Sequence, residues 1–325
     1  MACLHPIAIK NRRYATHAED YNLSQQYLHP FDIAKKVLLV PCGKCPECIR
    51  QMRNDWKIRL SLELTHQRKM HRSSYFVTIT FSPEYYERAL KDPTKVFRAM
   101  METYRHKFKT SIKHAFFQEF GTQGTRRLHF HGLLFGCPFR ISEIREVFSA
   151  FGYCWIRPVR PADAGYTSKY VCKQPTDDPR YANPAYRRKF VSPSVGRDLC
   201  GFPPPSATRY TWSFNAPSIG VSFHHRIPRY YDVHLTESDL LFRAAQSAYR
   251  LVVTGVSPVP LLVIEKIMAE YLSDEQIACI HNRYGSEYIR KYHRDTALLN
   301  QQRSQVSKGL GSFHPYKYGH IDPDV

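Results

Sequence analysis

Two histidines lie one residue apart in the apolar run RRLHFHGLLF, residues 126–135. Because the side chains of a strand alternate between its two faces, His129 and His131 share one face and Phe130 takes the other. Two neutral imidazoles in this arrangement can bind one divalent cation if a neighbouring strand adds an oxygen ligand. Histidine pairs on strands also occur as packing residues without a metal, so the interpretation depends on their partners.

Glu119 is the candidate oxygen ligand. The segments on either side of the turn GTQGT are typical of a β-hairpin. If the turn centres near Gly124, residue 119 lies across from residues 129 to 131. A set made of His129, His131 and Glu119 suits Mg²⁺ or Mn²⁺ bound to a phosphate, because such a metal polarises a non-bridging oxygen and orients the ester.

A nucleophile is available in AGYTSKYVCKQ, residues 164–174. Tyr166 and Tyr170 are four residues apart on one face of an expected helix, with Lys169 and Lys173 on roughly the same side. Because the solution pKa of tyrosine is near ~10, its phenolate needs a nearby metal or ammonium group. A phosphotyrosine would keep the energy of a broken phosphodiester for later resealing, which a water nucleophile cannot do. Tyrosines at this spacing are also common as core rings.

Three cysteines in PCGKCPEC have C-x2-C-x2-C spacing: Cys42, Cys45 and Cys48. In a reducing compartment this spacing indicates thiolate metal ligation. Position 52 is methionine instead of the fourth cysteine of a ferredoxin run, which favours zinc over an iron–sulfur cluster. Cys3, or failing it His5, could complete a tetrahedral structural Zn²⁺ site. The alternative is three reduced cysteines in a turn.

The elements that must position these groups follow from hydrophobic periodicity and turn residues. The expected elements are a helix over 49–66, a strand over 74–81, a helix from Pro93 with a buried stripe to Ile112, hairpin strands over 114–120 and 127–135, a helix over 142–151 and a strand over 153–160. From 74 on, this order is that of the split βαβ, or ferredoxin-like, arrangement. The first and third strands then lie at the centre of a four-stranded antiparallel sheet. Both helices cover one face, so the imidazoles share the open face with Thr78 and Thr80.

The rest of the chain divides by composition. Eight of the 22 prolines fall between Pro175 and Pro217, which indicates an irregular, basic connecting region. Two helices are expected beyond it, from Thr236 and from Ser273, where Gln276 completes a capping box. The last twenty residues show no periodicity. We therefore expect an α+β protein in four parts: a cysteine-rich zinc-type segment with its helix (1–70), the antiparallel core (71–175), a Pro-rich basic region (176–235) and a helical C-terminal region (236–325).

The charge balance indicates the kind of partner. Lys+Arg number 47 against 28 Asp+Glu, a formal net charge of +19 at pH 7. This favours a polyanionic partner, and 22 Tyr and 19 Phe offer rings on which unpaired bases can stack. No apolar run approaches the ~18 residues that span a bilayer, and the first charges follow the short apolar stretch, so we expect a cytosolic protein. The sequence has no G-x-x-x-x-G-K-[ST] phosphate loop, so no nucleotide hydrolysis is expected.

Taken together, FVTITFS, HFH and YTSKY, in that order, resemble the HUH endonuclease superfamily, in which a His-hydrophobe-His strand is followed by a tyrosine helix. The chain is more closely similar to the replication initiators of microviruses, in particular their gokushovirus-like branch. The segments that carry this resemblance are MACLHP, PCGKCPEC followed by NDWKIRL, LHFHGLLFG, GYTSKYVCK, PSIG and IPRYYD. The resemblance covers roughly residues 1–235.

The resemblance implies rolling-circle initiation on single-stranded origin DNA. A tyrosine would attack a phosphodiester, forming a 5′-phosphotyrosine and a 3′-OH that primes synthesis, and the strand would later be rejoined into a circle. It also implies an HUH-type fold, a host helicase and polymerase as partners, and the cytoplasm of a bacterial host as the location.

Carried onto this chain, the resemblance makes His129 and His131 metal ligands, while Glu119 is our geometric addition. Tyr166 and Tyr170 become alternating nucleophiles, and Lys169 stabilises the phenolate or the leaving oxygen. The remaining basic residues near these groups are assigned to DNA binding: Lys173, Arg126 and Arg127.

Two other classes of protein share parts of this pattern. One is a non-enzymatic, zinc-containing protein that binds single-stranded nucleic acid, which would expose aromatic rings on the first and third strands. The other is a one-tyrosine HUH transposase or relaxase. The paired tyrosines and the cysteine block favour the phage initiator.

Overall fold

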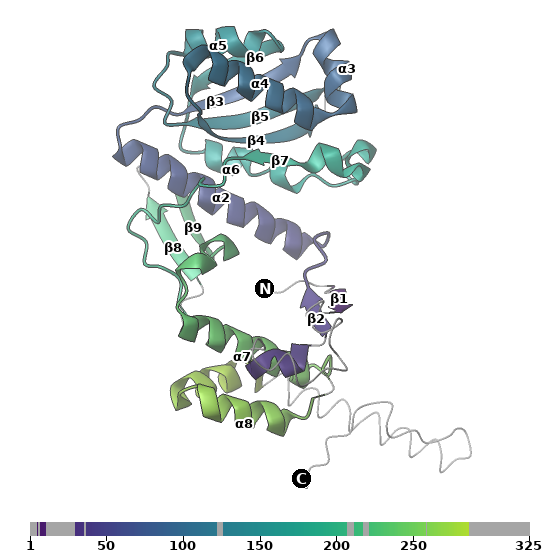
Figure 1. Cartoon of the computed structure of the whole chain (residues 1–325), viewed down its shortest axis with the longest axis vertical. Helices are drawn as coiled ribbons and strands as arrows, with labels where there is room; N and C mark the ends of the chain where they lie inside the picture. Colours follow the sequence, from purple (N-terminus) through teal and green to yellow (C-terminus); the bar gives the residue numbers. More distant parts are fainter. Residues whose placement is uncertain are drawn as a thin grey trace, which may run out of the picture. The chain divides into compact units, whose positions relative to one another are not determined.

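The computed structural model describes residues 5, 7–10, 30–35, 37–121, 126–206, 211–216, 221–257 and 259–285. These form two compact units (Figure 1). The first unit lies within Gly43–Pro205 and Arg209–His234, and the second draws on Cys3–Cys42 and Leu235–Val325. All candidate catalytic residues belong to the first unit. The four-part division expected from the sequence remains a prediction.

A five-stranded antiparallel sheet forms the centre of the first unit. Its strands lie in the order β6 (Gly152–Pro158), β3 (Tyr75–Phe81), β5 (Leu128–Phe135), β4 (Lys113–Phe120) and β7 (Lys189–Val191). The central position of β3 and β5 is therefore confirmed. The edge strand β7 is new and corrects the expectation that the Pro-rich region is irregular. A three-residue strand is too short to show alternation, so no sequence pattern predicts it.

Three helices cover one face of this sheet: α3 (Pro83–Lys91), α4 (Pro93–Phe108) and α5 (Ile141–Ser149). The Ser82 side chain caps α3, and the Asp92 carboxylate caps α4 by accepting from two backbone N–H groups. The helix α3 was not expected. The helix from Pro93 ends at Phe108, because Lys109 takes a left-handed conformation with φ 53°, so Ile112 is buried beyond the helix.

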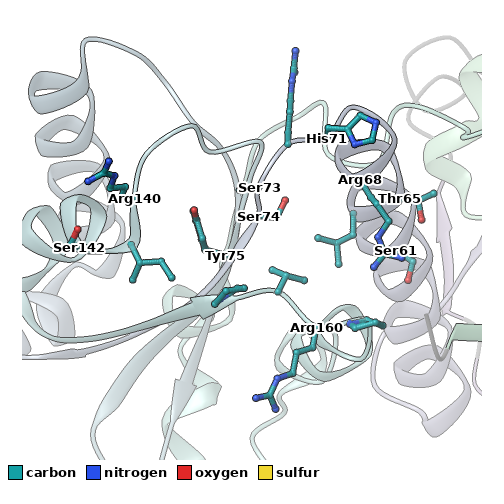
Figure 2. A pocket seen from close by; sticks show the side chains of 16 residues that line it. Ser61, Thr65, Arg68, His71, Ser73, Ser74, Tyr75, Arg140, Ser142 and Arg160 are labelled. Atoms are coloured by element: carbon teal, nitrogen blue, oxygen red, sulfur yellow. The ribbon is translucent and has the colours of Figure 1, made fainter. Parts of the chain in front are cut away.

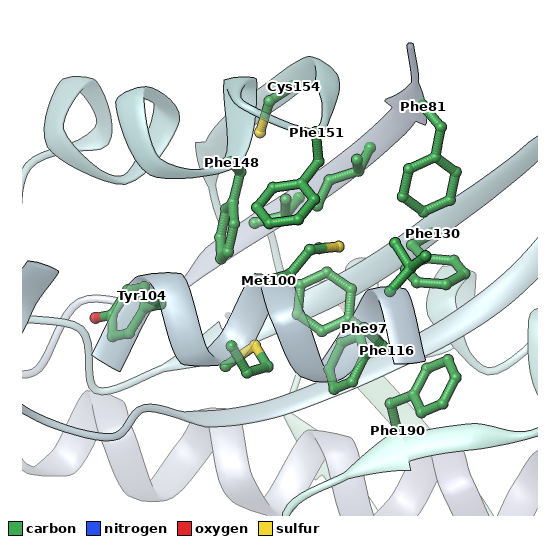
Figure 3. Close-up of a cluster of buried hydrophobic side chains, with 14 of the residues drawn as sticks. Phe81, Phe97, Met100, Tyr104, Phe116, Phe130, Phe148, Phe151, Cys154 and Phe190 are labelled. Atoms are coloured by element: carbon green, nitrogen blue, oxygen red, sulfur yellow. The ribbon is translucent and has the colours of Figure 1, made fainter. Parts of the chain in front are cut away.

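Aromatic side chains fill the layer between these helices and the sheet, as Figure 3 shows. Phe97 of α4 stacks on Phe190 of β7 with ring centroids 4.3 Å apart, and Phe81 meets Phe130 edge-on at 4.8 Å. Burial of each such ring contributes about 1.5–3 kcal/mol to folding. A Cβ at Gly132 would lie 2.3 Å from the Phe116 ring, so the residue after the second histidine must be glycine for this core to close.

The opposite face of the sheet, expected to be open, is partly covered. The elements that cover it are α2 (Pro46–Lys69), α6 (Asp163–Thr167) and η2 (Tyr170–Cys172). Trp56 of α2 meets Phe117 of β4 edge-on at 5.6 Å, and Leu60 is fully buried against this face. The face stays open at the β6 edge, where Tyr153 is 70% and Trp155 43% exposed. Figure 1 shows α2 on one side of the sheet and α4 and α5 on the other.

The far side of α2 packs on the rest of the first unit. That part contains η3 (Pro179–Ala182), η4 (Pro184–Arg187), the hairpin of β8 (Thr211–Ala216) and β9 (Val221–Arg226), and η6 (Arg229–His234). Ile58 and Leu62 of α2 are buried with Trp212, Ile227 and Tyr231. The helix expected over 49–66 is thus confirmed as α2, but it is apolar on two sides, because it separates two layers.

The second unit has a small hairpin and a helical part. Its elements are β1 (Ile7–Lys10), η1 (Pro30–Lys35), β2 (Val37–Val40), α7 (Glu237–Val253), α8 (Leu261–Tyr271) and a helix described over 274–285. The two expected helices are confirmed: Thr236 caps α7, and Ser273 and Gln276 form the expected capping box. The last twenty residues lie outside the described part of the chain. Among the described residues, no helix combines the length and apolar character needed to span a membrane.

Candidate active site

Two rows of side chains cross the sheet on the face that α2 partly covers. The first row, from β4 to β6, is Glu119, His129, Thr80 and Tyr153. The second row is Phe117, His131, Thr78 and Trp155. The placement of Glu119 opposite His129 is the register that the hairpin pattern predicts. Because residues two apart on a strand share a face, the two imidazoles lie side by side with ring centroids 6.0 Å apart.

Each imidazole is held by a threonine of β3. Thr80 Oγ1 lies 2.8 Å from Nδ1 of His129, and Thr78 Oγ1 lies 3.0 Å from Nδ1 of His131. Burial, and then the neighbouring His131, lower the pKa of His129 below its ordinary value, so its neutral form is favoured. With both Nδ1 atoms occupied, Nε2 is the nitrogen that each ring offers to another group.

Glu119 is engaged in two polar contacts. Its carboxylate lies 3.1 Å from Nε2 of His131 and 2.8 Å from Nζ of Lys173. Burial opposes its charge, but the hydrogen bonds from His131 and Lys173 outweigh burial and lower the pKa of Glu119. Among the described residues, only the cysteine triad brings three potential ligand atoms within 4.8 Å of one another. The histidine and glutamate groups are therefore neighbours that are not gathered around one centre.

The two tyrosines stand beside the histidines in different environments. The Tyr170 ring stacks on the His131 ring at 4.4 Å with an interplanar angle of 10°, and Tyr170 is 7% exposed. Burial, and then a hydrogen bond with Tyr166, raise the pKa of Tyr170. Tyr166 meets Tyr170 edge-on at 5.4 Å and leans on Phe76 at 5.8 Å, yet stays 42% exposed. The expected helix is a short α6 followed by the 3-10 turn η2.

A buried ion pair fixes the start of this tyrosine segment. Asp163, 4% exposed, accepts two hydrogen bonds from the Arg157 guanidinium at 2.7 and 2.6 Å. The same carboxylate accepts the backbone N–H of Arg160 at 2.6 Å. Such a bidentate pair gives geometric specificity as well as energy. The sequence analysis missed this pair, although an acidic residue at the start of a helix was a possible signal.

A basic groove adjoins Tyr166. The groove has a volume of about 710 Å³ and lies between α2 and the tyrosine segment. Its basic residues are Arg50, Arg53, Lys57 and Lys169. Lys169 Nζ lies 5.2 Å from the centre of the Tyr166 ring. The sequence analysis did not connect the three α2 residues to the tyrosine, because that link depends on packing.

The other residues assigned to DNA binding are dispersed. Lys173 pairs with Glu119 next to the histidines. Arg127 packs its guanidinium 4.6 Å from the centre of the Tyr86 ring, and Arg126 is exposed at the turn that precedes β5. The carbonyl of Arg126 accepts a hydrogen bond from Arg180. The structure does not bring these three residues together on one surface.

The cysteine triad lies at the beginning of α2. The ligand atoms of Cys42, Cys45 and Cys48 lie within 4.8 Å of one another, and the last two residues are buried. Three sulfur ligands at this separation suit a tetrahedral metal such as zinc. Cys3, the expected fourth ligand, lies outside the described residues, and His5 is exposed. This group could hold a metal.

Comparison with known proteins places these features in a context. Residues 74–175, which contain the two rows and the tyrosine segment, match the family model of the replication-associated protein ORF2. The chain is also similar to the replication-associated protein ORF2 of Spiroplasma virus 4, with 28% identity over 200 residues. That match covers 54% of this chain and 61% of the length of the viral protein. No solved structure matches the chain significantly.

Proposed function

We propose that this protein is a viral rolling-circle replication initiator of the HUH endonuclease type. It nicks single-stranded origin DNA by tyrosine attack, holds the new 5′ end as a phosphotyrosine and later rejoins the strand into a circle. The observation that carries this proposal is the exposed Tyr166 beside Tyr170, whose ring stacks on His131. The match of residues 74–175 to a family of replication-associated proteins supports it.

Tyr166 is the first nucleophile in this proposal. Its phenolic oxygen attacks the scissile phosphorus, the bond from phosphorus to the 3′ oxygen breaks, and the phenolic proton is balanced by the new 3′-OH. Tyr166 is accessible, whereas the raised pKa and burial of Tyr170 disfavour its phenolate. Lys169 stabilises the Tyr166 phenolate or the leaving oxygen. Tyr170 acts in the second cleavage, once the DNA has altered its surroundings.

His129, His131 and Glu119 would hold a catalytic Mg²⁺ or Mn²⁺. The threonine contacts at Nδ1 leave both Nε2 atoms for a metal, and this fits the donor set. When bound, the metal would polarise a non-bridging phosphate oxygen. Glu119 would have to turn from His131 and Lys173, which leaves the Lys173 ammonium for a DNA phosphate.

Single-stranded DNA is the proposed partner. The basic groove beside Tyr166 offers ammonium and guanidinium groups to the backbone, and exposed Tyr153 and Trp155 continue the two histidine rows to the sheet edge, where bases can stack. Duplex unwinding and synthesis fall to a host helicase and polymerase, in the cytoplasm of a bacterial host. Zn²⁺ bound by Cys42, Cys45, Cys48 and Cys3 has a structural role.

The decisive experiment is covalent trapping. Wild-type protein incubated with Mn²⁺ and origin single-stranded DNA should give an adduct that survives denaturing electrophoresis. We expect Tyr166→Phe to abolish the first adduct, because its exposed oxygen is the attacking atom, and Tyr170→Phe to retain it. Adduct formation by the Tyr166→Phe variant would refute the assignment.

The same experiment separates the alternatives. If no variant and no wild-type protein forms an adduct while DNA binding is intact, the chain is the non-enzymatic binder that exposed Tyr153 and Trp155 would also suit. If Tyr170→Phe supports both cleavage and rejoining, the chain uses one tyrosine, as the burial of Tyr170 would suit.

A further inference from the structure

A second pocket lies along the C-terminal half of α2. It has a volume of about 810 Å³ and is lined by residues of α2, the start of β3, the start of α5 and the segment 158–161. In Figure 2, Thr65 and Arg68 project from α2 on one side of this pocket, and Arg140 and Ser142 lie on the other. We name it the arginine pocket.

The arginine pocket is strongly basic. Its charged side chains are Arg68, Arg72, Arg140 and Arg160, with His71 beside them, and none of its 16 lining residues is acidic. All four arginines are exposed, and within the described part of the chain no carboxylate forms an ion pair with their guanidinium groups. Four such guanidinium groups around one hollow repel one another, so an anion bound between them would be stabilised.

The floor of the pocket offers hydroxyl groups without partners. The Oγ atoms of Ser61 and Ser74 are buried and make no hydrogen bond, and Ser61 is 5% exposed. A buried hydroxyl without a partner costs about 1–3 kcal/mol, which a ligand oxygen would relieve. Guanidinium and hydroxyl donors together are the groups that bind phosphate oxygens.

The arginine pocket shares both of its long walls with the basic groove beside Tyr166. On α2, Lys57 lines the groove and Ser61, one turn later, lines the pocket. On the opposite wall, Ala162 lines the groove and Pro161 lines the pocket. From Lys57 to Arg68 the helix rises by ~16 Å. A strand whose phosphate lies at Tyr166 can therefore continue along α2 into the pocket.

We infer that the arginine pocket binds the phosphodiester backbone of the single-stranded DNA that reaches Tyr166. The inference rests on the proposed function, because it takes the DNA to Tyr166. It adds a binding site about half the length of α2 away from the reacting atoms. The ligand is a continuous strand and not a separate nucleotide, because the walls of the pocket continue to the tyrosine.

Salt-dependent DNA binding tests this inference in a protein that cannot cleave. Tyr166→Phe is combined with Arg68→Ala and Arg140→Ala, and the matched control combines Tyr166→Phe with Arg98→Ala and Arg105→Ala, two exposed arginines of α4. Loss of two phosphate contacts should lower the slope of log affinity against log salt by about 1.4 and weaken binding about tenfold at low salt. The control pair should leave both quantities unchanged.

An unchanged slope in the pocket variant, or an equal loss in the control, would overturn the inference. Because binding is measured without cleavage, this failure is distinct from failure of the proposed function, which would appear as an adduct formed by Tyr166→Phe alone.

A second measurement does not depend on removing charge. Cysteine is introduced at Ser142 in the pocket or, as control, at Ser149 at the other end of α5, and its labelling by a thiol reagent is timed. Single-stranded DNA should slow labelling at position 142 and not at 149. Equal protection at both positions would contradict the inference. So would equal protection by inorganic phosphate at the same phosphate concentration, which would identify a site for the anion alone.

Discussion

At the scale of single residues, the candidate site depends on side chains that carry no chemistry of their own. Thr78 and Thr80 hold the Nδ1 atoms of His131 and His129, and Asp163 holds the start of the tyrosine segment through Arg157. Such supporting groups fix the orientation of a ligand or nucleophile before it reacts, which is why their loss is felt at the reacting atoms.

We therefore expect Thr80→Val to weaken the metal site while the fold is retained. Without the hydroxyl, the His129 ring loses its fixed orientation, and the Mn²⁺ concentration for half-maximal adduct formation should rise about 10–100-fold. Thr103→Val is the control, because Thr103 is exposed on α4 and its hydroxyl donates to the backbone oxygen of Ala99. An unchanged Mn²⁺ requirement in Thr80→Val would argue against His129 as a ligand.

At the scale of elements, the edge strand β6 serves two layers. Its alternate residues Cys154 and Ile156 are buried under the helices, while Tyr153 and Trp155 point to the face of the histidines and stay exposed. The pairing of β6 with β3 places the two rings next to Thr80 and Thr78. The strand thus extends the site toward solvent.

Removal of these rings should weaken DNA binding. Stacking on an aromatic side chain contributes about 1–3 kcal/mol per base, so Trp155→Ala should reduce affinity for single-stranded DNA about 5- to 100-fold, measured by fluorescence anisotropy. Tyr271→Ala, which removes an exposed ring of the second unit, should have no effect. If both variants bind as the wild type does, β6 is not a stacking surface.

At the scale of the whole molecule, α2 connects every part of the first unit. The cysteine triad lies at its beginning, its apolar sides pack on the sheet and on Trp212 and Tyr231, and its basic side lines both the groove and the arginine pocket. A metal held by the triad would fix the first turn of this helix, and with it Arg50 and Arg53.

Metal removal should therefore affect both stability and binding. We expect about one zinc per chain by atomic emission, and Cys45→Ser combined with Cys48→Ser should lose it and lower the midpoint of thermal unfolding by several degrees. Cys279→Ser, in the second unit, should retain the zinc and the midpoint. A wild-type protein without zinc, unchanged by chelators, would show that the triad is reduced cysteine alone.

Much of the sheet and the position of the candidate site could be predicted from the sequence. Alternation assigned His129 and His131 to one face, the hairpin spacing placed Glu119 opposite His129, and element order placed β3 and β5 at the centre. These features follow from local periodicity and turn length, which each stretch of chain expresses by itself.

Only the tertiary structure decided what covers that face and what each tyrosine contacts. Their four-residue spacing made Tyr166 and Tyr170 equivalent in the sequence, whereas packing buried Tyr170 on His131 and left Tyr166 exposed beside the basic face of α2. Those contacts join residues more than thirty positions apart in the chain, as with Tyr170 and His131. The periodicity of one segment states which side will be buried, but the partner that buries it is chosen by the packing of all segments together.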